Sequence, residues 1–380
     1  MFVIRQAKLD DVGALVKLAK MVHFINLPAD REIIAQKVLR SRECFLKAAG
    51  VEDHTIGSKR GPGGKGKDEG LPAIVSSTDF FMLVLEDTST NVCVGTSQII
   101  ARMGGPGNPN FSMQLSKRDY FSKSLQTGTS QIVAKLYGDE TGPAELGGLI
   151  LQPAARGHKL GRFLSLVRFH LIGLHRELFP DRAIAEMMGP ITADGQSLLW
   201  EYFGRRFIPL SYTEADKHCQ RSREFISALL PSEDIYLSLL PPEARDVVGR
   251  VGEETIPARR LLEKLGFEYK NFVDPFDGGP HLEAQIDDLA IVKATRTAEL
   301  GEAKGVPTVP AYVSLLNEDG EFRAVDTKIT VDGAKRIGMD REQMKELGWD
   351  VGTKVGVTVM EEKPEPKKKK PAARGKKVAS

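Results

Sequence analysis

The sequence predicts an α+β fold: a mixed sheet with flanking helices, arranged as two similar halves, followed by a small C-terminal β-barrel. A strand, a basic glycine-bearing turn and a helix follow one another over residues 145–169. A helix–glycine–aromatic pattern occurs twice, as LLWEYFGRRF at 198–207 and as LLEKLGFEYK at 261–270. Glycine is common directly after helices, so a chance match is the competing explanation. Short alternating strands fill residues 306–360 around one short helix, which indicates the barrel.

The other predicted elements follow from apolar spacing, which is helical where residues recur every three to four positions and extended where they alternate. Asp10 or Asp11 is the expected cap of the first helix, and Asp30 that of the second. Residues 102–130 are rich in Gly, Pro and Asn and then polar, which predicts a long excursion over the acceptor side. In chain order we expect strand 2–5, helices 12–22 and 31–48, strands 79–86, 92–101 and 149–151, helix 160–169, strand 182–187, helix 197–203 and strand 206–210.

The composition is that of a folded globular protein, with 41% hydrophobic and 27% charged residues among 380. No window approaches the roughly 18 apolar residues of a membrane span, so no membrane association is expected. Three separated cysteines and scattered histidines lack metal-ligand spacing, so we expect no metal site and a reducing cytoplasm. Residues 361–380 carry eight Lys or Arg and three Glu, which leaves a net charge of −3 on residues 1–360. This tail should be disordered, with at most weak contacts to nucleic acid.

The clearest chemical signal is the stretch from Glu145 to Phe169, ELGGLILQPAARGHKLGRFLSLVRF. A turn between a strand and a helix leaves the first N–H groups of the helix unpaired and adds the positive end of its dipole, which suits a phosphate. A P-loop would need GxxxxGK[ST] and a dinucleotide-binding fold GxGxxG, and neither is present. The pattern R-x-x-x-x-G after LQP resembles the acyl-CoA pyrophosphate loop of the GNAT N-acyltransferase superfamily. An ordinary strand–turn–helix with a basic cap is the alternative.

The usual form of that loop is Q/R-x-x-G-x-G/A, and Lys159 stands at its first glycine. We expect this departure to require only a right-handed helical backbone at Lys159. The resemblance implies that the CoA phosphates contact Arg156, Gly157, His158, Lys159, Leu160 and Gly161.

Over the whole chain, the motifs resemble the arginine N-succinyltransferase family. The resemblance covers about residues 1–48 and 79–360, and it implies transfer of a succinyl group from succinyl-CoA to the α-amine of L-arginine. Succinyl-CoA is then a co-substrate, and no permanently bound cofactor is expected. The family's acyl-CoA-contacting leucine matches Leu149. Stretches that carry the resemblance include LPAD (27–30), DETGPAEL (139–146), GRFLSLVRF (161–169), AEMMG (185–189), EAD (214–216) and FDGGP (276–280).

The element order and the resemblance together divide the chain into four segments. The sequence does not decide between a monomer and a homo-oligomer. These are a GNAT-like acyl-CoA-binding half at 1–211 with a mobile insertion at about 50–78, an abbreviated second GNAT-like half at 212–300, a small β-barrel at 301–361 and a disordered basic tail at 362–380.

Three positions depart from the family pattern. The family's catalytic His, expected just before Ile-Tyr, is Glu233; its His in D-H-T-G is Glu140; and its Arg in E-M-R-G is Met188. These departures leave open another acyl donor, another amine acceptor or a non-catalytic homologue.

The reaction needs a group that takes a proton from the amine and a donor, typically a backbone N–H of the central strand, that binds the thioester oxyanion. The candidate catalytic residues are Glu233, Glu145 and His281, with His218 as another source of an imidazole. A carboxylate can accept the proton, but at pH 7 it is a poor acid unless its pKa is raised. Glu145 begins the central strand, where a structural role is equally compatible with the sequence.

Overall fold

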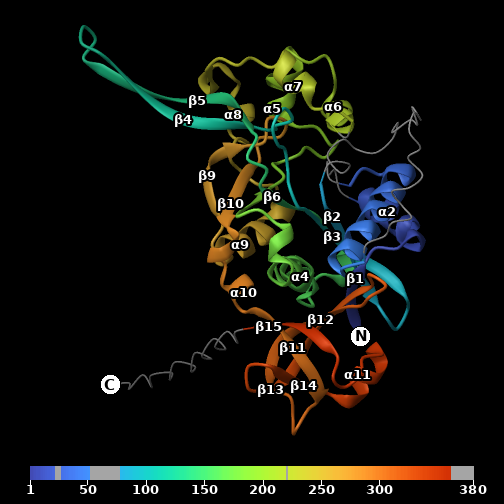
Figure 1. Cartoon of the computed structure of the whole chain (residues 1–380). Coiled ribbons are helices and arrows are strands. Elements are labelled where there is room, and N and C mark those ends of the chain that lie inside the picture. Colours follow the sequence, from blue (N-terminus) through green and yellow to red (C-terminus); the bar gives the residue numbers. More distant parts are fainter. Residues whose placement is uncertain (22–26, 52–77, 220, 361–380) are drawn as a thin grey trace, which may run out of the picture.

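The computed structural model describes residues 1–21, 27–51, 78–219 and 221–360 (Figure 1). The expected insertion, apart from residues 50, 51 and 78, and the whole expected tail lie outside these ranges. In the described part of the chain, no helix is long and apolar enough to cross a membrane. The strands are β1 (Phe2–Gln6), β2 (Phe80–Asp87), β3 (Val92–Ile100), β4 (Asn110–Ser122), β5 (Thr127–Asp139), β6 (Ala144–Leu151), β7 (Arg182–Glu186), β8 (Ile235–Tyr236), β9 (Glu268–Val273), β10 (Pro280–Gln285), β11 (Thr295–Glu302), β12 (Val309–Leu316), β13 (Phe322–Asp332), β14 (Arg336–Met339) and β15 (Lys354–Val359). The α-helices are α1 (Val12–Ala19), α2 (Arg31–Ala48), α4 (Leu160–Leu174), α5 (Leu198–Tyr202), α6 (Tyr212–Cys219), α7 (Glu224–Leu229), α8 (Pro242–Arg245), α9 (Ile256–Leu265), α10 (Ala290–Lys293) and α11 (Arg341–Leu347).

The strands join in one sheet in the order β12-β15-β11-β14-β13-β1-β2-β3-β6-β7-β10-β9-β4-β5-β8. Helices α1 and α2 cover one face of its central part, called here the α2 face, where Ile100 and Ile184 are buried (Figure 1). Helix α4 covers the opposite face, the α4 face, against Leu146 and Ala183. The predicted mixed sheet with flanking helices is therefore confirmed.

Local sequence sets where several helices begin. Asp30 accepts hydrogen bonds from two N–H groups in the first turn of α2, as predicted, and Ser197 caps α5 in the same way. Asp11 does not cap α1 itself: its carboxylate accepts from the Lys8 N–H at 2.7 Å, at the start of the 3-10 turn that leads into α1, and binds Arg5, with Oδ2 2.8 Å from Nη1. The expected cap is thus an ion-pair partner of the first strand.

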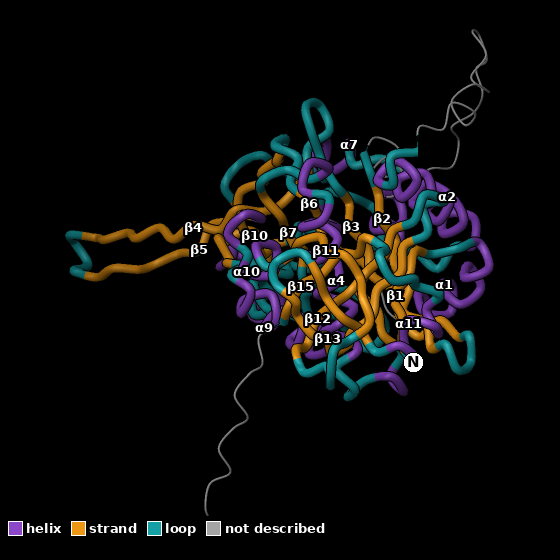
Figure 2. Tube along the Cα trace, turned by 60° about the horizontal axis from the view of Figure 1, so that its bottom comes forward, coloured by secondary structure: helices purple, strands orange, loops and turns teal. Residues whose placement is uncertain are grey.

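A long hairpin of β4 and β5 occupies most of the stretch expected to be a long excursion. The two strands pair from Asn110 with Asp139 to Ser122 with Thr127 and project from the body (Figure 2). Most of the hairpin is exposed on both sides, so it lacks the alternation of apolar and polar residues that identifies a half-buried strand. For this reason the sequence did not identify the two strands of the expected excursion.

The strand expected at 206–210 is also absent. A 3-10 turn covers Gly204–Arg206, and the N–H of Ile208 bonds back to the Gly204 carbonyl at 2.9 Å. One member of the helix–glycine–strand repeat therefore has no strand, and the two-half arrangement stays a prediction.

Strands β11 to β15 close into a five-stranded barrel, because β12 pairs with both β15 and β13. Val313, Val325 and Val357 fill its interior, and α11 adds Met344 to the same cluster. The predicted small barrel is confirmed, and its strands run from residue 295, within the segment assigned to the second half, to residue 359. Strand β13 also pairs with β1, so the barrel and the central sheet share hydrogen bonds.

A buried histidine ties α4 to the barrel. The ring nitrogens of His170 each lie 2.6 Å from a hydroxyl, Nδ1 from Thr358 Oγ1 and Nε2 from Ser314 Oγ. Burial lowers the pKa of His170 to about 3, so the ring is neutral and joins the two parts through hydrogen bonds alone.

Candidate active site

The site is organised around the point where β6 and β7 separate. The two strands are parallel, and their pairing is short: it consists of two register pairs at the start of β6, Ala144 with Ala183 and Glu145 with Ile184. On its other edge β6 stays paired with β3 through a register shift, near which Gly148 has a φ of +57°. Beyond Glu145, the β6 N–H groups that face β7 therefore have no strand partner within the described residues. They are available to a ligand that lies between the strands.

The loop after β6 leads directly to the N-terminus of α4. Residues 156–159 are exposed along this loop, whereas Leu160 is buried in the core. No side chain caps the first turn of α4, so its N–H groups can bind an external anion, assisted by the helix dipole. The guanidinium of Arg156 lies 3.2 Å from Glu254 Oε2 in an exposed ion pair. The residues predicted to bind CoA phosphates thus lie together, beside the opening between β6 and β7.

Lys159 corrects one expectation from the sequence. Its φ of +61° and ψ of 4° place it in the left-handed region, not in the right-handed helical region. An L-residue with a side chain pays about 1–2 kcal/mol for this conformation, which explains why the related loops have glycine at the position. The chain keeps the loop geometry and tolerates the strain.

On the α2 face, buried polar side chains surround the start of the opening. Glu145 pairs with Ile100 of β3, and Gln98 points to the same face because side chains two residues apart share a face. Gln98 and Glu145 are both fully buried, and neither amide atom of Gln98 has a hydrogen-bond partner among the described residues. Burial lowers the pKa of Lys37 of α2 to about 8, although Glu145 and Asp216 oppose this shift. A buried amide such as that of Gln98 is rarely left unsatisfied unless water or a ligand completes its hydrogen bonds.

An imidazole and two carboxylates meet one strand further on. Glu186, at the end of β7, pairs with His281 of β10, and the His281 Nε2 lies 4.0 Å from Glu186 Oε1. Atoms of Glu186, Asp274 and His281 that could bind a cation all lie within 4.8 Å of one another. Asn110 Nδ2 donates to Glu186 Oε1 at 2.7 Å. His281 is 7% exposed, and its Nε2 has no hydrogen-bond partner in the described structure, so it can take up a proton.

Four carboxylates meet in this region: the partly buried Glu186 and Asp216 of α6, and the buried Asp274 and Asp277 of the turn after β9, with the cations Lys37 and Arg223 nearby. Burial, assisted by the charge of Asp274, raises the pKa of Asp216 to about 7. Burial and the neighbouring carboxylates also raise the pKa of Asp274 and of Asp277. Asp277 is held in the turn by the N–H of Gly279, which donates to Oδ1 at 2.7 Å. A cationic ligand would favour the ionised forms and gain charge-assisted hydrogen bonds.

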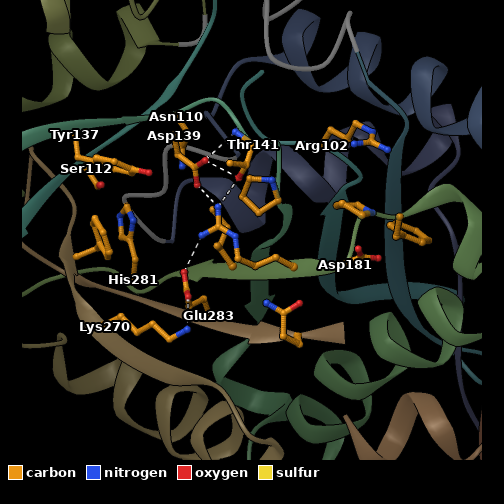
Figure 3. Close-up of a pocket in the computed structure, with 17 residues that line it drawn as sticks. Arg102, Asn110, Ser112, Tyr137, Asp139, Thr141, Asp181, Lys270, His281 and Glu283 are labelled. Carbon is orange, nitrogen blue, oxygen red and sulfur yellow. Dashed lines mark hydrogen bonds and ion pairs between the residues drawn. The ribbon is translucent and has the colours of Figure 1, made fainter. Parts of the chain in front are cut away.

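A pocket of about 720 Å³ opens on the α2 face (Figure 3). His281 and Asn110 contribute to its wall. Arg182 also lines the pocket and binds Asp139 and Glu283, with Nη1 2.8 Å from Glu283 Oε2. Pockets of this volume commonly hold small molecules, so an amino acid fits.

The structure brings two of the three predicted catalytic residues to one face and keeps the third apart. Glu145 and His281 lie on the α2 face of β6 and β10, with β7 between them. Glu233 is exposed in the loop before β8, which pairs with β5 at Ala134. Ala134 is five residues along β5 from Asp139 in the pocket wall, a span of roughly 17 Å. A catalytic role for Glu233 stays a prediction without support from proximity.

Sequence reasoning missed several polar residues of this region, although some signals were present. Glu186 and Asp216 lie in the AEMMG and EAD stretches, but only the fold shows that these stretches meet. Lys37 occupies the buried stripe of α2 between Ile34 and Ser41, where an apolar residue is expected. No sequence pattern distinguishes Gln98 from its neighbours in β3.

Comparisons with known proteins agree on one family. The family model described as arginine N-succinyltransferase beta subunit matches residues 73–291. Arginine N-succinyltransferases of Escherichia coli and Shigella dysenteriae are 31% identical over 359 residues, which is 93% of this chain and 96% of each relative. The solved structure of the arginine/ornithine succinyltransferase subunit AI from Pseudomonas aeruginosa superposes with a TM-score of 0.74 at 25% identity, over 94% of this chain and 98% of that one. The resemblance found in the motifs is confirmed, and the chain belongs to the arginine N-succinyltransferase family.

Proposed function

We propose that this protein transfers the succinyl group of succinyl-CoA to the α-amine of L-arginine. The observation that carries the proposal is the convergence of separated stretches, those containing Glu145, Glu186, Asp216 and Asp277, on one buried acidic region beside the opening between β6 and β7. A region with excess carboxylates suits an acceptor with a permanently charged guanidinium group. Relatives named for this reaction, matched over nearly their full length, support the same acceptor.

In this proposal the pyrophosphate of CoA binds the N-terminus of α4, and the pantetheine arm lies in the opening. Arg156 supplies charge to the phosphates, because its exposed ion pair with Glu254 contributes little and is easily exchanged. Leu149 contacts the acyl end of CoA. The thioester carbonyl then lies beside the bulge at Gly148, where an unpaired β6 N–H stabilises the oxyanion. Succinyl-CoA is consumed as a co-substrate and CoA is released, and no permanently bound cofactor takes part.

The acceptor approaches from the pocket on the α2 face. Its α-ammonium gives a proton to Nε2 of His281, and the nitrogen lone pair attacks the thioester carbon. The oxyanion collapses and the C–S bond breaks; the CoA thiolate takes up the second proton that the nitrogen loses as the amide forms, and His281 returns the first proton to solvent. Glu186 stabilises the protonated His281, and Glu145 holds the acceptor by its negative charge. His281, rather than Glu233, is therefore the proposed base.

A thiol-release assay tests the reaction, with succinyl-CoA or acetyl-CoA as donor and arginine, ornithine or lysine as acceptor. We expect CoA release with succinyl-CoA and arginine, and a product heavier than arginine by one succinyl group. Release only with another pair would keep an acyltransferase and overturn the substrates, an alternative that the departures at Glu140, Met188 and Glu233 motivate. No release in any pairing, with CoA binding intact by calorimetry, would identify a non-catalytic homologue.

We also propose two GNAT-like halves, with a boundary near residue 211, and the cytoplasm as the site of action. The segment of α9 and β9 supports the second half, because Gly266 ends the helix at a φ of +108° before the strand begins. All three cysteines, Cys44, Cys93 and Cys219, are buried free thiols, which supports a reducing compartment.

A further inference from the structure

Arg168 of α4 is a buried cation without a carboxylate partner. Its side chain is 2% exposed and lies on the α4 face, across the sheet from Glu145. Nε donates to the Ser165 carbonyl at 3.1 Å, Nη2 to Ser165 Oγ at 2.9 Å, and Nη1 to the Gly147 carbonyl at 3.4 Å. Among the described residues, no Asp or Glu forms an ion pair with it. The guanidinium charge is therefore not neutralised by the protein around it.

Two partly buried arginines of this chain do have such partners. Arg5 binds Asp11 and Glu86, and Arg182 binds Asp139 and Glu283. Their carboxylates raise the pKa of both guanidinium groups despite burial.

For Arg168, burial acts alone and lowers the pKa to about 10. An unpaired charge in the interior destabilises the fold, so we expect Arg168 to have a function that outweighs this cost.

Arg168 lies near the proposed binding position of the acyl donor. It is about 12 Å along α4 from the first residue of the helix, where the pyrophosphate is proposed to bind. Its Nη1 reaches Gly147, next to the bulge where the thioester is proposed to lie. The guanidinium therefore lies beside the part of the opening that the acyl group would occupy.

We propose that the guanidinium of Arg168 binds the distal carboxylate of the succinyl group and so selects a dicarboxylic acyl-CoA over monocarboxylic acyl-CoAs of equal length. Two methylene groups separate this carboxylate from the thioester carbonyl, which matches a cation already in contact with the bulged strand. A guanidinium has five N–H donors, and three are used in the described structure, so two remain for a carboxylate. The inference rests on the proposed function for the acyl donor, but it does not depend on the acceptor.

The competing explanation is that Arg168 only ties α4 to β6. If Arg168 only holds α4 against β6, its replacement should weaken the binding of every CoA ligand equally. If it binds the carboxylate, its replacement should weaken the binding of succinyl-CoA alone. Butyryl-CoA separates the two, because it has the same chain length and carries a methyl group in place of the carboxylate.

The test is calorimetric binding of succinyl-CoA, butyryl-CoA and CoA to the full chain and to Arg168→Met, Arg168→Lys and Arg205→Met. Arg205 is an exposed arginine of an ion pair on another element and serves as the control. We expect Arg168→Met to weaken succinyl-CoA binding by ~100-fold and to leave butyryl-CoA and CoA binding unchanged. Arg168→Lys keeps the charge without the planar fork, so it should retain an intermediate preference for succinyl-CoA.

Equal losses for all three ligands, or an unchanged preference for succinyl-CoA in Arg168→Met, would overturn the inference. If circular dichroism shows that Arg168→Met does not fold, the Arg168→Lys variant provides the test. Its preference for succinyl-CoA over butyryl-CoA must then be smaller than that of the parent protein. An Arg168-dependent preference without any acylation of arginine would support the inference while the proposed function failed. If the protein succinylates arginine but its preference for succinyl-CoA is unchanged in Arg168→Met, the inference about Arg168 is refuted and the proposed function stands.

Discussion

The ionisation of Asp216 should control how tightly the protein binds arginine across neutral pH. Burial raises the pKa of this carboxyl to about 7, and its Oδ1 has no hydrogen-bond partner in the described structure. The acid is therefore half protonated near pH 7. A guanidinium group needs the ionised form, and the guanidinium of free arginine stays charged throughout this range.

The size of the effect follows from the fraction of ionised acid. With a pKa of about 7, the apparent dissociation constant is raised ~11-fold at pH 6 and ~1.1-fold at pH 8, so affinity should rise about tenfold between them. Asp216→Asn should remove this dependence and weaken binding at pH 8 by ~10- to 100-fold, the usual range for a lost charged hydrogen bond.

Stability should follow pH in the opposite direction. Between the unfolded pKa near 4 and the folded pKa of about 7, the native state binds a proton that the unfolded state lacks, so the free energy of unfolding falls as pH rises through this window. Asp216→Asn should therefore unfold at a higher temperature than the parent protein at pH 8.

Calorimetric titration of arginine in the presence of CoA at pH 6, 7 and 8 measures the affinity. Glu214→Gln is the matched control, because Glu214 lies two residues away on the same helix and is exposed. An affinity independent of pH, or a tenfold dependence that survives in Asp216→Asn, would refute the assignment of this carboxylate to the acceptor.

Three further predictions concern the base, the loop and the barrel. His281→Gln should lower kcat in the thiol-release assay by ~10²- to 10⁴-fold while Glu233→Gln leaves it nearly unchanged, and the reverse ranking would return the role to Glu233. Lys159→Gly should raise the free energy of unfolding in urea by about 1 kcal/mol, because glycine adopts the positive φ without strain; a lower value would contradict the strain argument. His170→Ala should lower the same free energy by about 2–4 kcal/mol by leaving buried hydroxyls unpaired and a cavity behind, and Ser314→Ala should cost less. A neutral His170→Ala would show that α4 and the barrel are held by other contacts.

The parts of the fold that were predictable are those whose apolar spacing reports a buried face. The strand–turn–helix around Gly157, the first hairpin and the barrel strands bury one or both sides, so their apolar pattern is local and readable. The β4–β5 hairpin is exposed on both sides and carries no such signal. Lys159 was misread because its left-handed backbone is set by the turn and not by its own preference.

The site was only partly predictable because it forms from residues that are distant in the chain. The phosphate-binding loop is contiguous, and the sequence identifies it directly. Glu186, Asp216 and Asp274 come together only because β7, α6 and the turn after β9 meet on one face of the sheet. Arg168 appears in the sequence as one more basic residue of a helix, and only burial without a carboxylate distinguishes it.

The pairing of β1 with β13 also determines when the sheet around β1 can be completed during synthesis. Strand β1 gains β2 as a neighbour once residue 87 has emerged from the ribosome, but its other edge waits for Ala324, which aligns with Ile4. At translation rates of about 5–20 residues per second, that edge stays open for on the order of ten to fifty seconds. An open strand edge next to a hydrophobic face is a template for pairing with other chains. The nascent chain is thus most exposed to aggregation between the synthesis of its second strand and that of its barrel, and a ribosome that pauses in this interval prolongs the exposure.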